Sequence, residues 1–75
     1  MKSAIEWYII QEVKKRRKAK KWSQQYIADC LNISRSYIKN IESPKHIASY
    51  NVDHINELAK IFGISPKDFW PENPL

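Results

Sequence analysis

The side chains best suited to bind a polar or charged ligand are concentrated in one short stretch of the chain. Within six positions the sequence supplies two cations, two hydroxyls and one amide, at Arg35, Ser36, Tyr37, Lys39 and Asn40. Arginine and lysine bind phosphates, and arginine, hydroxyl and amide groups also hydrogen-bond the base edges exposed in a DNA groove. The composition of this stretch therefore favours contacts to nucleic acid.

No comparable grouping predicts catalysis or metal binding. Gly63 is the only glycine, so the sequence has no glycine-rich loop to cradle a phosphate. Cys30 is the only cysteine, which leaves a zinc site without a set of thiolates. His46 and His54 are eight positions apart with no cluster of carboxylates beside them. We therefore expect no enzyme activity, no metal and no cofactor.

Length and charge narrow the class of protein. The 75 residues are 43% apolar, enough for one compact core, and we expect one domain over residues 1–75 with a short tail at 71–75. Thirteen Lys and Arg against eight Asp and Glu give a formal net charge of +5, which suits a polyanion as partner. Because no long apolar stretch predicts a signal peptide or membrane span, we expect a cytoplasmic protein without a membrane partner.

Local signals predict an all-α fold of five helices that must position these side chains. The expected helices run from about 4 to 20, from the cap Ser23 to 31, from the cap Ser34 to 43 and from 52 to 62, with a short last one between Ser65 and Pro71. The fourth helix is expected to bury the apolar residues that recur at helical spacing, which are Val52, Ile55, Leu58, Ala59 and Phe62.

Residues 23–42 have the spacing of two short helices joined by a tight turn. Ala28 is small enough to let two helices cross closely, and Asn32 tolerates the left-handed backbone of a sharp turn. Ile38 and Ile41, three positions apart, are expected to anchor the second helix on the core. The opposite face of that helix, which carries the polar and basic stretch described above, is then left to solvent.

In these features the sequence resembles the phage repressor and Cro-like helix-turn-helix domains, the XRE family of bacterial regulators. The resemblance covers nearly the whole chain and rests on Val13, Arg17, Ser23, Gln24, Ala28, Ile38, Ile41 and Glu42. It implies a compact five-helix bundle of the lambda-repressor type that binds double-stranded DNA with a recognition helix at about residues 34–43 in the major groove. Lys21 and Asn32 depart from the family pattern, which often has glycine at both positions.

The resemblance also assigns roles to individual residues. It implies an ion pair between Arg17 and Glu42, which explains an arginine on an apolar stripe. It implies base contacts from Arg35, Ser36, Tyr37 and Asn40, and phosphate contacts from Gln24, Ser34, Lys39 and Lys45. Two alternatives stay open: Arg35 reads a guanine or binds a phosphate, and the basic run at 14–21 binds DNA or forms a solvated helix face.

Two functions of different classes fit these expectations. The first is a transcriptional regulator that binds a palindromic operator as a homodimer. The second is an antitoxin or interaction module that keeps the fold and binds a protein partner such as a toxin or effector. Four aromatic residues near the two ends of the chain either close the core or form a dimer surface, and they are Trp7, Tyr8, Phe69 and Trp70.

Overall fold

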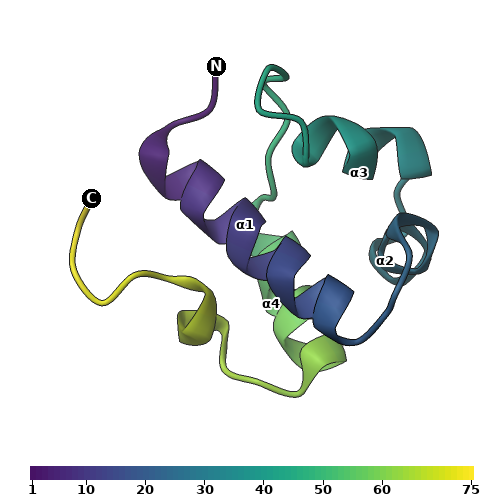
Figure 1. Cartoon of the computed structure of the whole chain (residues 1–75). Coiled ribbons are helices and arrows are strands. Elements are labelled where there is room, and N and C mark those ends of the chain that lie inside the picture. The colour runs from purple at the N-terminus through teal and green to yellow at the C-terminus, as the bar shows by residue number, and fades with distance from the viewer.

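The computed structural model describes every residue from Met1 to Leu75 and contains four α-helices and one 3-10 helix. Their bounds are α1 (Ala4–Ala19), α2 (Gln24–Leu31), α3 (Arg35–Ile41), α4 (Val52–Phe62) and η1 (Pro66–Phe69). In Figure 1, α1 crosses in front of α4, with α2 and α3 on one side and the C-terminal residues on the other. The molecule measures 31 × 28 × 22 Å along its principal axes. None of its helices combines the length and apolar character needed to cross a membrane.

The prediction of five α-helices is wrong in its last element. Ser65 caps η1 and Asp68 completes a capping box, as expected, but the element is a single 3-10 turn of four residues. Trp70 ends it in an extended conformation, with ψ at 150°. The physical reason is Pro71, because the residue before a proline is driven out of the helical region. The all-α class is correct, with four α-helices in place of five.

Local capping explains where the helices begin. Ser3, Ser23 and Ser34 all have extended backbones, and each side-chain oxygen accepts a hydrogen bond from the third residue of its helix. The helix predicted for residues 34–43 is shorter in the structure. α3 covers Arg35–Ile41, and Glu42 is its C-cap. The helix ends two residues earlier than predicted because Pro44 cannot continue it.

Two helices end on residues with a left-handed backbone. Asn32 ends α2 with φ at 55°, and Gly63 ends α4 with φ at 70°. A third residue, Lys21, also has a positive φ of 60°, in the connection between α1 and α2. Lys21 therefore holds the backbone conformation for which the related domains often use glycine.

Residues from every helix meet in the core. The largest fully buried side chains are Val13, Ile10, Ile27, Ile38, Ile41, Leu58 and Phe69. Burying an aliphatic or aromatic side chain of this size stabilises the fold by about 1.5–3 kcal/mol. Trp22 closes the corner between α1 and α2, with its ring stacked on Phe62 at a centroid distance of 5.1 Å. Of the terminal aromatics, Phe69 lies in the core, whereas Trp70 is 44% exposed.

One residue that the sequence predicts to be buried in the core is exposed to solvent. Val52 was expected to be buried with the inner stripe of α4, yet it is 77% exposed. Val52 is the first residue of α4 and lies at the rim of a cavity of about 270 Å³ that it shares with Ile5 and Trp70. The periodic stripe extends to the first residue of α4, where the neighbouring elements leave the side chain exposed.

Candidate nucleic-acid interface

The turn between α2 and α3 fixes the direction of α3. The left-handed backbone of Asn32 reverses the chain, and the Ile33 N–H then donates to the Ala28 carbonyl at 3.0 Å. Ala28 itself is fully buried at the crossing of the two helices, where a larger side chain would hold them apart. Ile38 and Ile41 are also fully buried and fix the inner side of α3. Its outer side is therefore presented to solvent.

The predicted base-contacting residues lie on this outer side. Arg35 and Ser36 are exposed, and Asn40 is half-buried. Tyr37 is 37% exposed, and its ring packs edge-on against His54 of α4 at a centroid distance of 6.5 Å. The structure thus brings these side chains together on seven residues of helix, with Tyr37 at the margin next to α4.

The predicted phosphate-contacting residues surround the same surface. Ser34 is exposed at the start of α3, where its side-chain oxygen accepts from the Tyr37 N–H at 3.0 Å. Lys39 and Lys45 are exposed on α3 and in the loop that follows it. None of the ion pairs in the structure involves Arg35, Lys39 or Lys45. Their positive charges are consequently not neutralised by neighbouring carboxylates.

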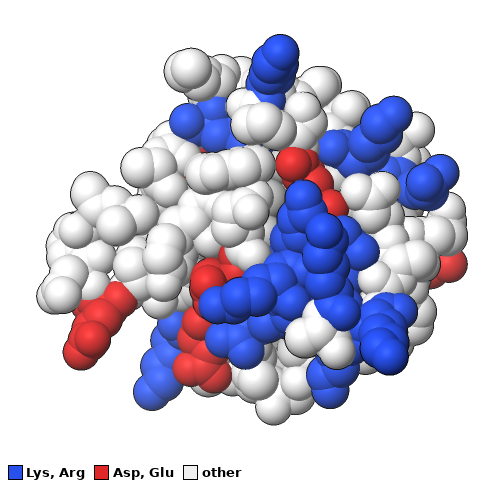
Figure 2. Space-filling model, in the orientation of Figure 1, with Lys and Arg blue, Asp and Glu red and all other residues white.

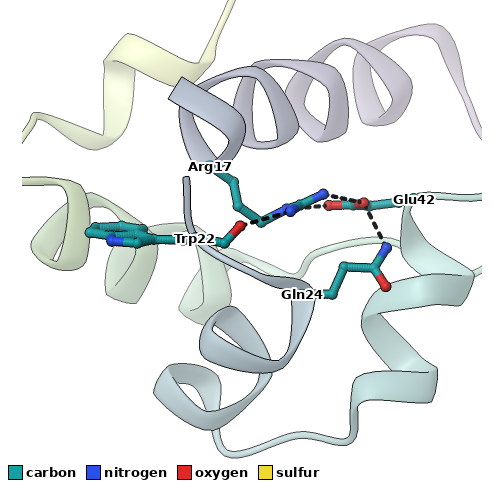
Figure 3. Close-up of polar contacts among 4 residues, drawn as sticks. All are labelled: Arg17, Trp22, Gln24 and Glu42. Carbon is teal, nitrogen blue, oxygen red and sulfur yellow. Dashed lines mark hydrogen bonds and ion pairs between the residues drawn. The ribbon is translucent and has the colours of Figure 1, made fainter. Parts of the chain in front are cut away.

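An ion pair beneath the interface joins α1 to the end of α3. Arg17 donates to Glu42 through Nε at 3.1 Å and through Nη2 at 3.0 Å, so the contact is bidentate. Its Nη1 donates to the Trp22 carbonyl at 2.9 Å (Figure 3). Only 9% of the Arg17 side chain and 4% of the Glu42 side chain are exposed. The two predicted partners therefore form a desolvated pair that is satisfied on both sides.

Gln24 extends this ion pair to α2. Its side-chain amide donates to Glu42 Oε1 at 2.9 Å, as Figure 3 shows. Glu42, the C-cap of α3, is thereby linked to the first residue of α2, which braces α3. An amide NH₂ carries two N–H groups, so Gln24 keeps a second donor for another acceptor.

One contact near the interface was missed by the sequence analysis. The Lys2 ammonium donates to the carbonyls of Asn40 at 3.3 Å and Ser43 at 2.6 Å, and also to that of His46. Between 38 and 44 positions separate these residues from Lys2. No local pattern could have revealed the contact, because it depends on how α1 packs beside the loop after α3.

The two histidines serve as hydrogen-bond acceptors for the backbone. His46 Nδ1 accepts from the Ala48 N–H at 3.1 Å. His54 Nδ1 accepts from the Asn51 N–H at 3.2 Å and completes a capping box at the start of α4. Partial burial lowers the pKa of His54, against the opposing effect of the Asp53 charge. The imidazole of His54 is thus held in its neutral form as an acceptor.

Basic side chains extend well beyond α3. Figure 2 shows Lys and Arg gathered over the C-terminal half of α1. Within this basic run, Lys15 pairs with Glu12 at 2.9 Å and Arg16 lies 3.9 Å from the same carboxylate. The side of the view occupied by the C-terminal residues shows almost no positive charge (Figure 2). On this face, the positive charge is therefore concentrated over the C-terminal half of α1.

Comparison with known proteins gives one match. The sequence profile of a family described as "Helix-turn-helix domain" matches residues 10–70, from the middle of α1 to the residue after η1. The match includes the whole of α2, the turn, α3 and α4. Searches of curated proteins and of solved structures gave no significant match.

Proposed function

Because this chain belongs to the helix-turn-helix domain family of the XRE and Cro-like type, we propose that it is a transcriptional regulator that binds a specific sequence of double-stranded DNA. Membership in the family implies DNA binding. What we propose beyond DNA binding is that the chain recognises a specific sequence and regulates transcription. The observation that carries it is the outer side of α3, where polar and basic side chains stand exposed on a helix anchored from within by Ile38 and Ile41.

We assign the readout of bases to side chains that project from α3. Arg35 donates two parallel hydrogen bonds to a guanine, and Asn40 pairs with an adenine, as these side chains do in major grooves. Ser36 and Tyr37 contribute further base contacts from the same helix. The Arg17–Glu42 pair supports this assignment, since it fixes the orientation of α3 from beneath.

Phosphate contacts then surround the base contacts. Lys39 and Lys45 contribute charge, and Ser34 and Gln24 contribute neutral donors at the starts of α3 and α2. Phosphate contacts position a protein on the duplex without selecting a sequence. We therefore expect substitutions of the base-contacting residues to change sequence specificity, and substitutions of the phosphate-contacting residues to leave it unchanged.

We further propose that two copies bind a palindromic operator with half-sites about one helical turn, or about 34 Å, apart. Each copy carries a net charge of +5, so two copies repel each other unless they meet through a surface with little positive charge. The cavity between α1 and the start of α4 meets that condition, because Glu6 is the only charged residue among those that line it. Val52 and Trp70 expose apolar surface at its rim.

The experiment that tests the proposal is selection of the purified chain on a pool of randomised duplexes at two salt concentrations. Sequencing of the retained DNA is expected to give a palindrome with half-sites spaced by one turn. Retention that is independent of sequence and falls steeply with salt would contradict a specific operator. That outcome would favour the antitoxin or protein-interaction alternative, in which the basic surface binds DNA without reading it.

A further inference from the structure

We infer that Lys2 is a positioning residue for DNA binding, which holds the C-terminal end of α3 and the following loop without touching DNA. The inference rests on the proposed function, because it assigns Lys2 a part in presenting α3 to the groove. It concerns a residue at the start of the chain, outside the family match at residues 10–70.

The contacts of Lys2 are those of a cation that caps a helix. Of the three carbonyls that Lys2 contacts, only that of Asn40 belongs to α3, and it also accepts from the Ser43 N–H at 3.2 Å. A positive charge at this end of a helix is favoured by the helix dipole. The Lys2 ammonium supplies such a charge and donates hydrogen bonds to the carbonyls of Asn40, Ser43 and His46. An ammonium has three N–H donors, so three carbonyls use all of them. None remains for a phosphate while this arrangement holds.

The loop held by Lys2 has few other restraints. Pro44 contributes no N–H, and the bonds within the loop are those from the His46 N–H to the Ser43 carbonyl at 3.3 Å and from the Ala48 N–H to His46 Nδ1 at 3.1 Å. A second link to α1 lies farther along, where the Ser49 hydroxyl donates to Glu6 Oε2 at 3.0 Å. Lys2, which precedes α1, and Glu6, in its first turn, therefore restrain the loop near its two ends.

Lys45 makes this restraint relevant to DNA. It lies in the loop between Ser43 and His46, whose carbonyls both accept from Lys2. Holding these two carbonyls fixes the backbone from which the Lys45 side chain projects. The third carbonyl belongs to Asn40, the last of the proposed base contacts along α3. Lys2 thus restrains the backbone of one proposed base contact and one proposed phosphate contact.

The first test uses the free chain and needs no DNA. We compare hydrogen exchange at the backbone N–H groups of Glu42, Ser43 and His46 in the wild type and in Lys2→Met. Loss of the ammonium is expected to speed their exchange by about two- to five-fold, the range set by one charge at a helix end. Exchange at the Ile64 N–H, which bonds Ala59 at the far end of α4, is expected to stay the same.

Two further variants serve as controls. Lys67→Met removes the same charge from an exposed residue of η1 and is expected to leave these exchange rates unchanged. Lys2→Arg keeps the charge and the donors, so it is expected to retain most of the protection. Equal exchange in the wild type and Lys2→Met would overturn the inference. So would an equal rise at Ile64, which would mean general destabilisation.

The second test measures affinity for the selected duplex over a range of salt concentrations. Lys2→Met is expected to weaken binding by about two- to five-fold without changing the salt slope, and Lys2→Arg to restore it. A slope lowered by about 0.9 would overturn the inference, because it would show a phosphate contact. Unchanged affinity would overturn it as well. If the wild type selects no sequence, the proposed function fails, whereas the exchange test still decides whether Lys2 holds the loop.

Discussion

The structural role of Arg17 depends on a partner 25 positions away in the sequence. Arg17 lies on an apolar stripe of α1, where a charge without a partner would be costly, and Glu42 supplies two charge-assisted hydrogen bonds. Gln24 and the Trp22 carbonyl satisfy further groups of the same pair. The pair links α1, α2 and α3 at one point, so its removal affects both stability and the orientation of α3.

Removing one half of this pair is expected to cost more than removing both. Arg17→Met leaves the Glu42 carboxylate, which is 4% exposed, without its cation and lowers the free energy of unfolding by about 3–5 kcal/mol. Arg17→Met combined with Glu42→Leu is expected to recover most of that loss. Urea denaturation of the three chains measures the difference. A double variant no more stable than Arg17→Met alone would contradict this account of the pair.

His54 makes the stability of the fold depend on pH. Burial lowers its pKa in the folded chain, so the unfolded chain, with a histidine pKa of about 6.5, binds the proton more readily. Its contribution is therefore complete above about pH 6.5 and is lost as the pH falls through the folded pKa. Protonation also removes the Nδ1 acceptor for the Asn51 N–H.

The measurement is the free energy of unfolding between about pH 7 and pH 5. The free energy of unfolding is expected to decrease as the pH is lowered, both in the wild type and in the control variant His46→Gln. His54→Gln preserves the capping-box chemistry without a titrating group, so its decline in this interval is expected to be smaller. A decline in His54→Gln as large as that in the wild type would rule out His54 as the source.

Among the helices and their connections, the clearest strain lies at Lys21. A left-handed backbone costs an L-residue with a β-carbon about 1–2 kcal/mol, whereas glycine adopts it freely. Lys21→Gly is therefore expected to raise the free energy of unfolding by about 0.5–1 kcal/mol, after allowance for the greater entropy of glycine in the unfolded chain. Asn32→Gly is expected to give a smaller change, because asparagine tolerates this conformation. Destabilisation by Lys21→Gly in urea denaturation would contradict the strain.

The helices were predictable from the sequence where their signals are local. Ser3, Ser23 and Ser34 cap helices by bonding a backbone N–H three residues away, and Asn32 ends α2 through its own backbone. Two features were missed, one for a tertiary and one for a local reason. Val52 continues the stripe of α4 beyond the point where other elements cover it, and η1 is shortened by the extended residue before Pro71.

The candidate site was predictable to a similar extent. Exposure of Arg35, Ser36 and Lys39 follows from Ile38 and Ile41, because residues opposite a buried helical stripe must face solvent. The partnership of Arg17 with Glu42 came from the resemblance to known domains. Neither source indicated the contacts of Lys2, since a long side chain reaches partners that spacing does not define.

At the scale of the whole molecule, the surface of the proposed dimer can be tested by adding charge to it. Val52→Lys adds a positive charge at the rim of the cavity between α1 and α4, whose lining has no Lys or Arg, without disturbing the core, since Val52 is 77% exposed. It is expected to abolish binding of two copies to the palindrome while one copy still binds a half-site. Asn56→Lys, exposed on α4 outside the cavity, is the matched control. Sedimentation that shows two copies of Val52→Lys on the palindrome would exclude this surface.

The central claim is that α3 reads bases while the loop beyond it only holds phosphate. The most direct test compares Arg35→Ala with Lys45→Ala for the affinity ratio between the selected duplex and a scrambled duplex of equal composition. Arg35→Ala is expected to reduce this ratio by an amount equivalent to about 1–3 kcal/mol. Lys45→Ala is expected to weaken both duplexes equally and to lower the salt slope by about 0.9. Equal effects of the two substitutions on the ratio would contradict the claim.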